Sequence, residues 1–423
     1  MKQRLKVAIL GAGSRGFGYA EGMMRAPEKF EITAACDLSR EQLDKMHTLA
    51  GLDNRVLFDD EEEFFKEKRG DALIITTYDT VHVRQCVRAL KMGYDVLLEK
   101  PISDRRDELY ELLKTQRETG RTVVVCHELR YGVMYEKLYE LMHSGVIGKL
   151  IAIDAMERVA YWHMAQAYVR LQAGTGNTTY PTILAKCSHD MDLVQYYAGA
   201  QCDTVSSIGG ETLFRKENAP KDAAERCLDC PHVDTCTYSA KKIYIEGFHK
   251  RGCPKFVWPF NKVSLKKPTT EEDLYEGLRT KCFGRCAFLC GVEENPHVVD
   301  HQLLQMNFKN GVTAVLKMVF AAEPGRRINL FGTEGELLLD ERLNAIEVRP
   351  YGKEMQVIDF DSLMEGGHGH GGGDQRLIEA LYDIVVDHAQ SPTSLENSLE
   401  CHLIGIAAEE SRLAGGKLVK VHE

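Results

Sequence analysis

The sequence predicts an α/β fold in two parts: a parallel sheet covered by helices, then a large open, mainly antiparallel sheet. Three observations support this prediction. Up to residue 126, short strands that are apolar throughout alternate with amphipathic helical stretches. From residue 148 onward, the apolar runs are longer and partly alternate with polar residues. A glycine-rich turn at residues 11–16 directly follows the first apolar run.

In the first part, residues 1–126, each short apolar run is predicted to be a buried strand, and each amphipathic stretch a helix on one face of the sheet. Gly93 and Gly120 follow two of these helices and are expected to end them. The strands are Val7–Leu10, Ile32–Cys36, Ala72–Thr76, Val96–Leu98 and Val123–Cys126, and the helices lie near 15–25, 39–50, 60–68, 79–92 and 104–119.

The second part, residues 127–423, is predicted to be an α/β domain that carries the open sheet. Asn310-Gly311 lies between two apolar runs and predicts a hairpin. Residues 211–297 fit neither pattern and are interpreted as a cysteine-rich insertion, and the C-terminal helices at 374–423 are expected to pack back across the junction. Strands are expected at 148–157, 303–319, 326–331, 335–340 and 346–352, helices near 131–144, 188–198, 374–389 and 395–414, and a loop at 366–373.

Composition narrows the class of protein. The 423 residues include 53 Lys+Arg and 63 Asp+Glu, a formal net charge of −10, which argues against a general nucleic-acid binder because phosphate contacts need a basic face. No apolar run approaches the roughly 18 residues of a membrane span. The N-terminus lacks a signal-peptide pattern, so we expect a cytoplasmic protein. In that reducing compartment the 13 cysteines are expected to be thiols or metal ligands.

The glycine-rich turn predicts a dinucleotide site. Gly11, Gly13 and Gly16 match the G-x-G-x-x-G pattern, and Asp37 ends the next strand about 20 residues later. There an acid can accept hydrogen bonds from the adenosine ribose and repel a 2′-phosphate, which favours NAD, while Arg40 keeps NADP possible. These features together predict an N-terminal Rossmann domain. The alternative is a glycine turn in a strand–helix unit that holds no ligand.

Two further motifs carry groups suited to proton transfer. Lys100 ends a predicted strand between Glu99 and Pro101, and it either contacts substrate or forms a surface ion pair with Glu99. His189 is followed by Asp190 and Asp192, and a histidine beside carboxylates can act as a general acid or base. The alternative for this second motif is a helix cap.

In order and spacing, the glycine turn, Glu99-Lys100-Pro101, His189-Asp190-x-Asp192 and Gly332-Thr333-Glu334-Gly335 resemble the Gfo/Idh/MocA oxidoreductase family, which includes inositol and glucose dehydrogenases. The resemblance implies that Lys100 and His189 contact the reacting carbinol, and that the open sheet supports a homodimer or homotetramer. Many relatives carry an aspartate four residues before the histidine, where this chain has Ala185. Lys186 beside it is therefore a further catalytic candidate that could lower the pKa of Lys100.

The remaining site residues are assigned around these motifs. Cofactor contacts are expected from Ser14, Arg15, Thr76, His82 and Glu99, and substrate contacts from Arg130, Tyr131, Asp190 and His301. Two more groups, His297 with Asp300, and His368 with His370 and Asp374, could also enter the substrate pocket, through hydroxyl contacts or a metal.

The insertion contains a C-x-x-C pair with further cysteines, which predicts a structural zinc site. The predicted ligands are Cys227, Cys230 and Cys236, with Cys290 as the fourth and Cys253 or Cys286 as its alternatives. Free thiols packed as small apolar groups are the other interpretation.

Three functions remain open from the sequence. The first is hydride transfer between a sugar or polyol carbinol and NAD(P). The second is an NAD-dependent glycosidase that oxidises its substrate transiently and eliminates the aglycone, with Lys186, Tyr131 or Tyr161 as the base. The third is a non-catalytic nucleotide sensor.

Overall fold

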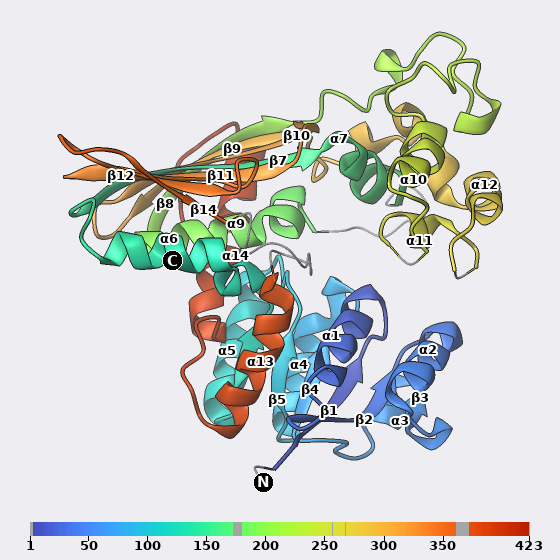
Figure 1. The fold of residues 1–423 in the computed structure, drawn as a ribbon, viewed down its shortest axis with the longest axis horizontal. Helices are drawn as coiled ribbons and strands as arrows, with labels where there is room; N and C mark the ends of the chain where they lie inside the picture. Colours follow the sequence, from blue (N-terminus) through green and yellow to red (C-terminus); the bar gives the residue numbers. More distant parts are fainter. Residues whose placement is uncertain (1–2, 172–179, 256, 267, 361–371, 423) are drawn as a thin grey trace.

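A computed structural model describes residues 3–171, 180–255, 257–266, 268–360 and 372–422. Two sheets organise these residues (Figure 1). One has six strands in the order β3-β2-β1-β4-β5-β6, and the other has nine in the order β14-β13-β12-β11-β7-β10-β9-β8-β15. The predicted fold class, a Rossmann-type parallel sheet followed by a mainly antiparallel sheet, is confirmed.

The six-stranded sheet is parallel throughout. Its central strands are buried except near the amino ends of β1 and β5, because helices cover both faces. The strand order reverses direction between β1 and β4, and ligands of such sheets bind in the crevice at this point, outside the carboxyl ends of the strands. The strands are β1 Leu5–Leu10, β2 Phe30–Cys36, β3 Leu57–Phe58, β4 Ala72–Ile75, β5 Asp95–Leu98 and β6 Val123–Val125.

The helices of this part follow the predicted stretches closely. Gly120 ends α5 in the left-handed conformation, as expected, whereas Gly93 lies one residue beyond the cap of α4. The helices are α1 Ser14–Met24, α2 Arg40–Ala50, α3 Glu61–Phe64, α4 His82–Lys91 and α5 Arg106–Thr119, with single turns η1 Asn54–Val56, η2 Asp79–Val81 and η3 Glu128–Tyr131.

In the nine-stranded sheet, only β7 and β10 pair in parallel. The predicted Asn310-Gly311 hairpin joins β9 to β10, which pair antiparallel. Figure 1 shows helices on one face of this sheet. The strands are β7 Leu150–Ala160, β8 Cys202–Gly210, β9 His301–Phe308, β10 Thr313–Ala322, β11 Gly325–Gly332, β12 Gly335–Asp340, β13 Ala345–Pro350, β14 Gln356–Asp359 and β15 Val419–Lys420.

Three helices cover that face: α6 Val133–His143, α9 Thr182–Ala198 and α14 Leu395–Leu413. Helix α9 begins six residues earlier than predicted, so that Ala185 and Lys186 are helical too. Helix α13, Gly373–Val386, instead packs with α1 in the core of the six-stranded sheet. The two C-terminal helices therefore pack on different sheets, α13 on the six-stranded sheet and α14 on the nine-stranded sheet. Among the described helices, none has the length and apolar character to cross a membrane.

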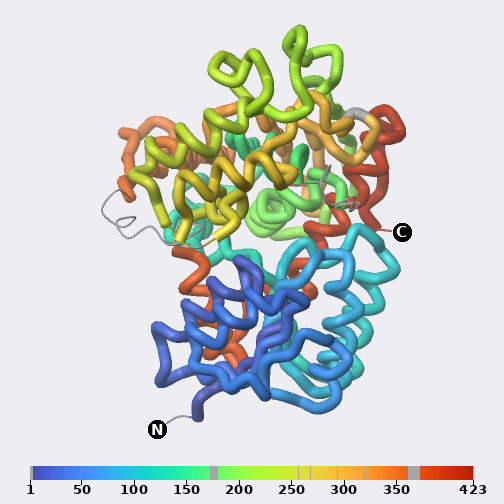
Figure 2. Tube along the Cα trace, turned by 90° about the vertical axis from the view of Figure 1, so that its right-hand side faces the viewer, coloured from blue at the N-terminus to red at the C-terminus, as the bar shows by residue number. Residues whose placement is uncertain are grey.

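The cysteine-rich insertion forms a separate lobe beyond the end of the nine-stranded sheet (Figures 1 and 2). It contains more helix than predicted, although only α12 exceeds two turns. Arg170, the last residue of η4, enters this lobe. The elements of the insertion are η5 Lys216–Asn218, η6 Cys227–Asp229, η7 Lys241–Glu246, α10 Gly247–Lys250, α11 Phe260–Val263, α12 Glu271–Thr280, η8 Cys282–Gly284, η9 Ala287–Leu289 and η10 Val292–Glu294, and the segment before α9 adds α7 Tyr161–His163 and η4 Met164–Arg170.

Candidate active site

The glycine turn connects β1 to α1 at the carboxyl edge of the six-stranded sheet. Gly11 has φ +96°, and a Cβ atom there would lie 2.6 Å from the Thr76 backbone, so only glycine fits. A Cβ on Gly16 would lie 2.0 Å from the Gly11 carbonyl oxygen, whereas one on Gly13 would meet no heavy atom within 4 Å. The turn is therefore closed behind Gly11 and Gly16 and open in front of Gly13.

Asp37, at the end of β2, is fixed against this turn. Its carboxylate accepts hydrogen bonds from the Ala12 amide at 2.7 Å and the Ser39 amide at 2.8 Å. Thr76, at the end of β4, donates to the Gly11 carbonyl at 2.5 Å. Both side chains thus hold the turn in shape, at the position where an adenosine ribose would lie in a Rossmann site.

Arg15, in the turn itself, is the centre of a cluster of acids. Its guanidinium contacts Glu99 at 2.5 Å, Asp374 at 2.9 Å and Glu128. The Tyr19 hydroxyl donates to Glu99 at 2.8 Å and to Glu128 at 2.9 Å. Glu99 ends β5, Glu128 follows β6 and Asp374 begins α13, so Arg15 joins three elements.

Lys100 reaches from the end of β5 to helix α9 of the second sheet. Its ammonium donates to the Ala185 carbonyl at 3.2 Å, one turn before His189. Burial lowers the pKa of Lys100 below its ordinary value, and Lys186 and Arg15 act in the same direction, against Glu99 and Glu128. A lysine with a lowered pKa can take up and release a proton closer to neutral pH.

Glu128 also approaches the histidine of the second motif. The distance from His189 Nε2 to a Glu128 carboxylate oxygen is 3.5 Å, and both side chains are buried. The sequence reasoning missed Glu128, although a signal was available: it follows the last strand of the parallel sheet, at the same edge as Lys100. Glu128 therefore places a carboxylate beside His189, whereas Ala185, at the position of the aspartate in many relatives, has none.

Lys186 lies in a second charge network, one residue beyond Ala185. It contacts Glu157 at 2.9 Å, and Arg326 joins Glu157 at 3.2 Å to Asp190 at 2.8 Å. His163 lies beside this network: burial lowers its pKa to about 3, and Lys186 and Lys100 add to the effect. The imidazole of His163 is therefore neutral at physiological pH and can accept a hydrogen bond.

Comparison with known proteins places this geometry in a family. Residues 5–127 match the family described as "Oxidoreductase family, NAD-binding Rossmann fold". The chain is 23% identical to the putative oxidoreductase YteT of Bacillus subtilis over 338 residues, 76% of this chain and 74% of YteT. It is 27% identical to glycosyl hydrolase family 109 protein 1 of Akkermansia muciniphila over 256 residues, 55% of this chain but only about half (52%) of that protein.

The fold is shared with scyllo-inositol dehydrogenase of Lactobacillus casei, solved with bound NAD(H) and scyllo-inositol, at a TM-score of 0.67 and 15% identity, with 100% of each chain covered. The match over residues 5–127 relates the Rossmann part of this chain to the Gfo/Idh/MocA oxidoreductases. Members of this family bind NAD in the Rossmann domain. The open front of Gly13 and the fixed carboxylate of Asp37 fit such a cofactor, because the first leaves room for a pyrophosphate and the second offers acceptors to ribose hydroxyls.

Several other residues assigned to this Gfo/Idh/MocA site have interior partners. His82 contacts the carbonyls of Pro101 at 2.9 Å and Thr77 at 3.2 Å. Arg130 forms two hydrogen bonds with Asp192, of 2.7 and 2.6 Å, inside the protein. The Tyr131 hydroxyl lies 3.1 Å from Thr393 Oγ1. These contacts give Arg130 and Tyr131 a place in the packing between the two sheets.

Among the described residues, His297, His301 and Asp374 each contact a different partner. His301 is half-exposed at the start of β9 and contacts Asp300 at 2.5 Å, while His297 contacts Glu409 at 2.8 Å. Asp374 contacts Arg15, as described above. His368 and His370 lie outside the described residues.

A separate buried cluster, His127, Cys401 and His402, has three atoms close enough to hold a metal ion. Both nitrogens of His402 are already engaged, because Nε2 accepts from the Ile102 amide at 2.9 Å and Nδ1 donates to the Ser398 carbonyl at 2.8 Å. These hydrogen bonds account for His402 as a structural residue.

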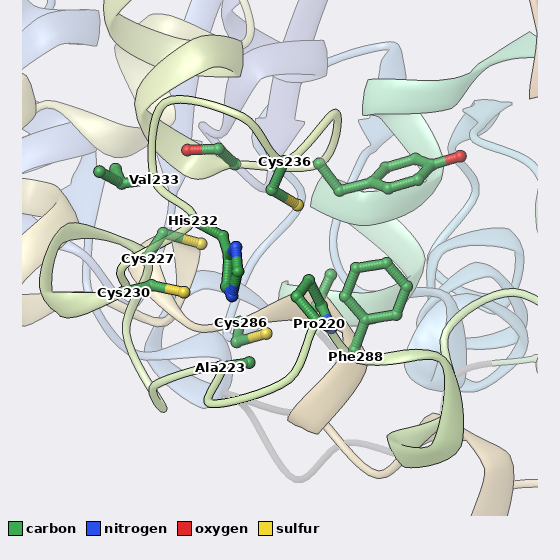
Figure 3. A pocket seen from close by; sticks show the side chains of 12 residues that line it. Pro220, Ala223, Cys227, Cys230, His232, Val233, Cys236, Cys286 and Phe288 are labelled. Carbon is green, nitrogen blue, oxygen red and sulfur yellow. The ribbon is translucent and has the colours of Figure 1, made fainter.

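In the insertion, the three predicted ligands Cys227, Cys230 and Cys236 line one small cavity (Figure 3). The fourth thiol at this cavity is Cys286, which the sequence reasoning held only as an alternative. Cys290 does not line it, and its thiol donates to the Cys286 carbonyl at 3.2 Å.

Proposed function

We propose that this chain is an NAD(P)-dependent dehydrogenase that transfers a hydride between a sugar or polyol carbinol and the nicotinamide. The observation that carries the proposal is the convergence of Lys100, His189 and Glu128 at the carboxyl edge of the parallel sheet, next to the glycine turn. The scyllo-inositol bound to the structurally similar dehydrogenase of Lactobacillus casei supports the polyol class. Bound NAD or NADP would supply the acceptor and donor of the hydride.

In this proposal the two sheets divide the work. Residues 1–126 hold the cofactor, with Gly13 beside the pyrophosphate and Asp37 on the adenosine ribose. Residues 127–423 shape the substrate pocket. Lys100 and His189 bind the reacting hydroxyl and carry its proton, and Glu128 stabilises the protonated form of His189. The second network fixes Lys186 and Asp190 as further substrate contacts, and His301 stays a candidate at the entrance.

Two variants test these roles. Lys100→Met and His189→Asn should each lower turnover by about 10²- to 10⁴-fold, the usual contribution of a positioned acid or base. NAD affinity should change little, because neither side chain belongs to the glycine turn. Lys68→Met is a matched control, since Lys68 lies in the same part and donates only to the exposed Gly93 carbonyl. Unchanged turnover in both variants would refute the roles proposed for Lys100 and His189, whereas no turnover in the wild-type protein, with NAD binding retained, would favour the nucleotide-sensor alternative.

A second candidate function is an NAD-dependent glycosidase that oxidises a sugar hydroxyl transiently and eliminates the aglycone. The 27% identity to a glycosyl hydrolase family 109 protein favours it. It needs a base for a carbon-bound proton. Lys186 is held by Glu157 next to the site and is the candidate for this base.

One incubation separates the two functions. The protein, NAD and a panel of sugars, polyols and aryl glycosides are combined, and NADH absorbance and free aglycone are read in the same wells. NADH formation with a particular sugar establishes the dehydrogenase. Aglycone release without net NADH establishes the glycosidase, and neither signal across a broad panel counts against both.

We further propose that the chain works in the cytoplasm as a homodimer or homotetramer. No disulfide joins any of the 13 cysteines, as expected in a reducing compartment. The face of the nine-stranded sheet opposite α6, α9 and α14 is available for a second copy (Figure 1). Light scattering of the purified protein tests this; a monomer at micromolar concentration would exclude a stable oligomer.

A further inference from the structure

The cavity in the insertion brings together thiols from distant parts of the sequence. Cys227 begins turn η6 and Cys230 follows it, and the amide of Cys236 closes a second turn by donating to the His232 carbonyl at 2.9 Å. Cys286 comes from a second segment, whose amide donates to the Glu225 carbonyl at 2.7 Å and whose Arg285 pairs with Arg226. Backbone pairing therefore fixes Cys286 opposite the C-x-x-C pair (Figure 3).

The size of the cavity limits what it can hold. Its volume is about 20 Å³. A cavity needs at least about 10–15 Å³ to take one water molecule, so this space has room for a single ion. A pair of cysteines two residues apart, completed by two thiols farther along the chain, is typical of structural zinc sites.

A buried cation next to the thiols is the second, independent observation. Arg170 is fully buried, and its guanidinium donates to the carbonyls of Arg285 at 2.8 Å and Tyr238 at 2.6 Å, and to Cys227 Sγ at 3.7 Å. Within the described part of the chain, no carboxylate lies within 4.0 Å of it. Buried charges in proteins are normally paired, so Arg170 requires negative charge from another source.

A tetrathiolate metal centre would provide that charge. Four thiolates around a divalent ion carry a net charge of −2, and donors near the sulfurs orient and stabilise such centres. We propose that Cys227, Cys230, Cys236 and Cys286 bind one divalent transition-metal ion of the zinc class, with Arg170 as its charge-balancing neighbour. The ion would fasten the insertion to turn η4, and through it to the rest of the second part.

The site must contract slightly to bind the ion. Among the described residues, no three of these sulfurs lie within 4.8 Å of one another. Zn–S bonds of about 2.3 Å in a tetrahedron place the sulfurs roughly 3.8 Å apart. A closure of at least about 1 Å is therefore needed. His232 also lines the cavity, and its Nε2 lies 2.6 Å from the Lys221 carbonyl, which fixes that nitrogen as a donor and leaves Nδ1 as the one atom of His232 that could replace a thiol as a ligand.

Metal analysis of the freshly purified full-length protein tests the proposal. We expect one equivalent of zinc per chain and no acid-labile sulfide. Cys230→Ser and Cys286→Ser should each lose the ion. Two control variants should keep it: Cys253→Ser, because Cys253 is exposed in the same insertion, and Cys290→Ser, because Cys290 lies outside the cavity.

Cobalt(II) reconstitution of the wild-type chain gives a second measurement that needs no variant to fold. Absorption bands of a tetrahedral tetrathiolate cobalt centre would support the ligand set. Absence of metal from the wild-type protein would overturn the proposal, and so would iron with stoichiometric sulfide. Retention of zinc by both Cys230→Ser and Cys286→Ser would overturn the ligand assignment.

Discussion

The two glycines on either side of Ser14 and Arg15 should respond in opposite ways to the same substitution. In Gly13→Ala the new Cβ meets nothing within 4 Å, and the φ of −66° is ordinary for alanine. In Gly16→Ala the Cβ would lie 2.0 Å from the Gly11 carbonyl oxygen and 2.7 Å from Thr76 Oγ1. The first change therefore spares the fold and fills the space in front of the turn, while the second forces the turn apart.

The magnitudes follow from these distances. Gly16 lies within α1, where alanine gains roughly 1 kcal/mol over glycine, but overpacking costs about 1–3 kcal/mol or more. A backbone oxygen more than an ångström too close places the cost at the upper end, so a net loss of about 2 kcal/mol is expected. Gly13 is the N-cap of α1, where alanine costs under about 1 kcal/mol. The Cβ of the new alanine should weaken the binding of NAD by about 10- to 100-fold, or roughly 1.4–2.7 kcal/mol of binding free energy.

Urea unfolding and calorimetric titration with NAD measure both effects. Gly13→Ala should unfold close to the wild-type midpoint and bind NAD weakly. Gly16→Ala should unfold earlier. If Gly13→Ala bound NAD with the wild-type Kd, the pyrophosphate would not pass in front of Gly13, and the proposed cofactor position would be refuted.

Two further predictions concern buried charges. Asp192→Asn leaves the Arg130 guanidinium without its buried carboxylate, so the free energy of unfolding measured in urea should fall by about 3 kcal/mol. KM for the sugar, measured well below the unfolding transition, should not change. A raised KM with unchanged stability would instead make Arg130 a substrate contact. Burial is the main cause that lowers the pKa of Lys100; Lys186 lowers it further and Glu128 raises it. In the pH profile of kcat/KM, the limb that reports Lys100 should therefore move to higher pH in Lys186→Met and to lower pH in Glu128→Gln. Glu400→Gln, which removes a buried carboxyl elsewhere, is the control. Shifts of both variants in the same direction would refute this electrostatic account.

Patterns local in sequence predicted most of the fold. The alternation of apolar runs and amphipathic stretches located five strands of the parallel sheet, and Asn310-Gly311 located the hairpin. Strand β3 was not predicted, because a strand of two residues has no periodic pattern. Helix α12 was missed within the cysteine-rich composition, although Thr270 caps it and its first turn is acidic, a recognisable start signal.

The candidate site divides in the same way. Lys100 and His189 belong to local motifs, so the sequence could single them out. Glu128 could have been predicted by the same rule as Lys100, because both residues follow the carboxyl ends of strands in one parallel sheet. The partners of Lys186 and Asp190 could not be predicted from the sequence. Glu157 lies on β7 and Arg326 on β11, and only the pairing of these two strands brings both side chains to α9.

The position of the carboxylate beside His189 changes how the site is assembled. An aspartate at position 185 would sit one turn away on the same helix, so the pair would be fixed within one part of the protein. Glu128 instead follows β6, and it also contacts Arg15 of the glycine turn. Lys100 in turn bonds to the Ala185 carbonyl, and Asp374 to Arg15. The contacts that align His189 with Lys100 are therefore the contacts that join the two sheets, and any motion between the sheets would act first on the acid–base pair.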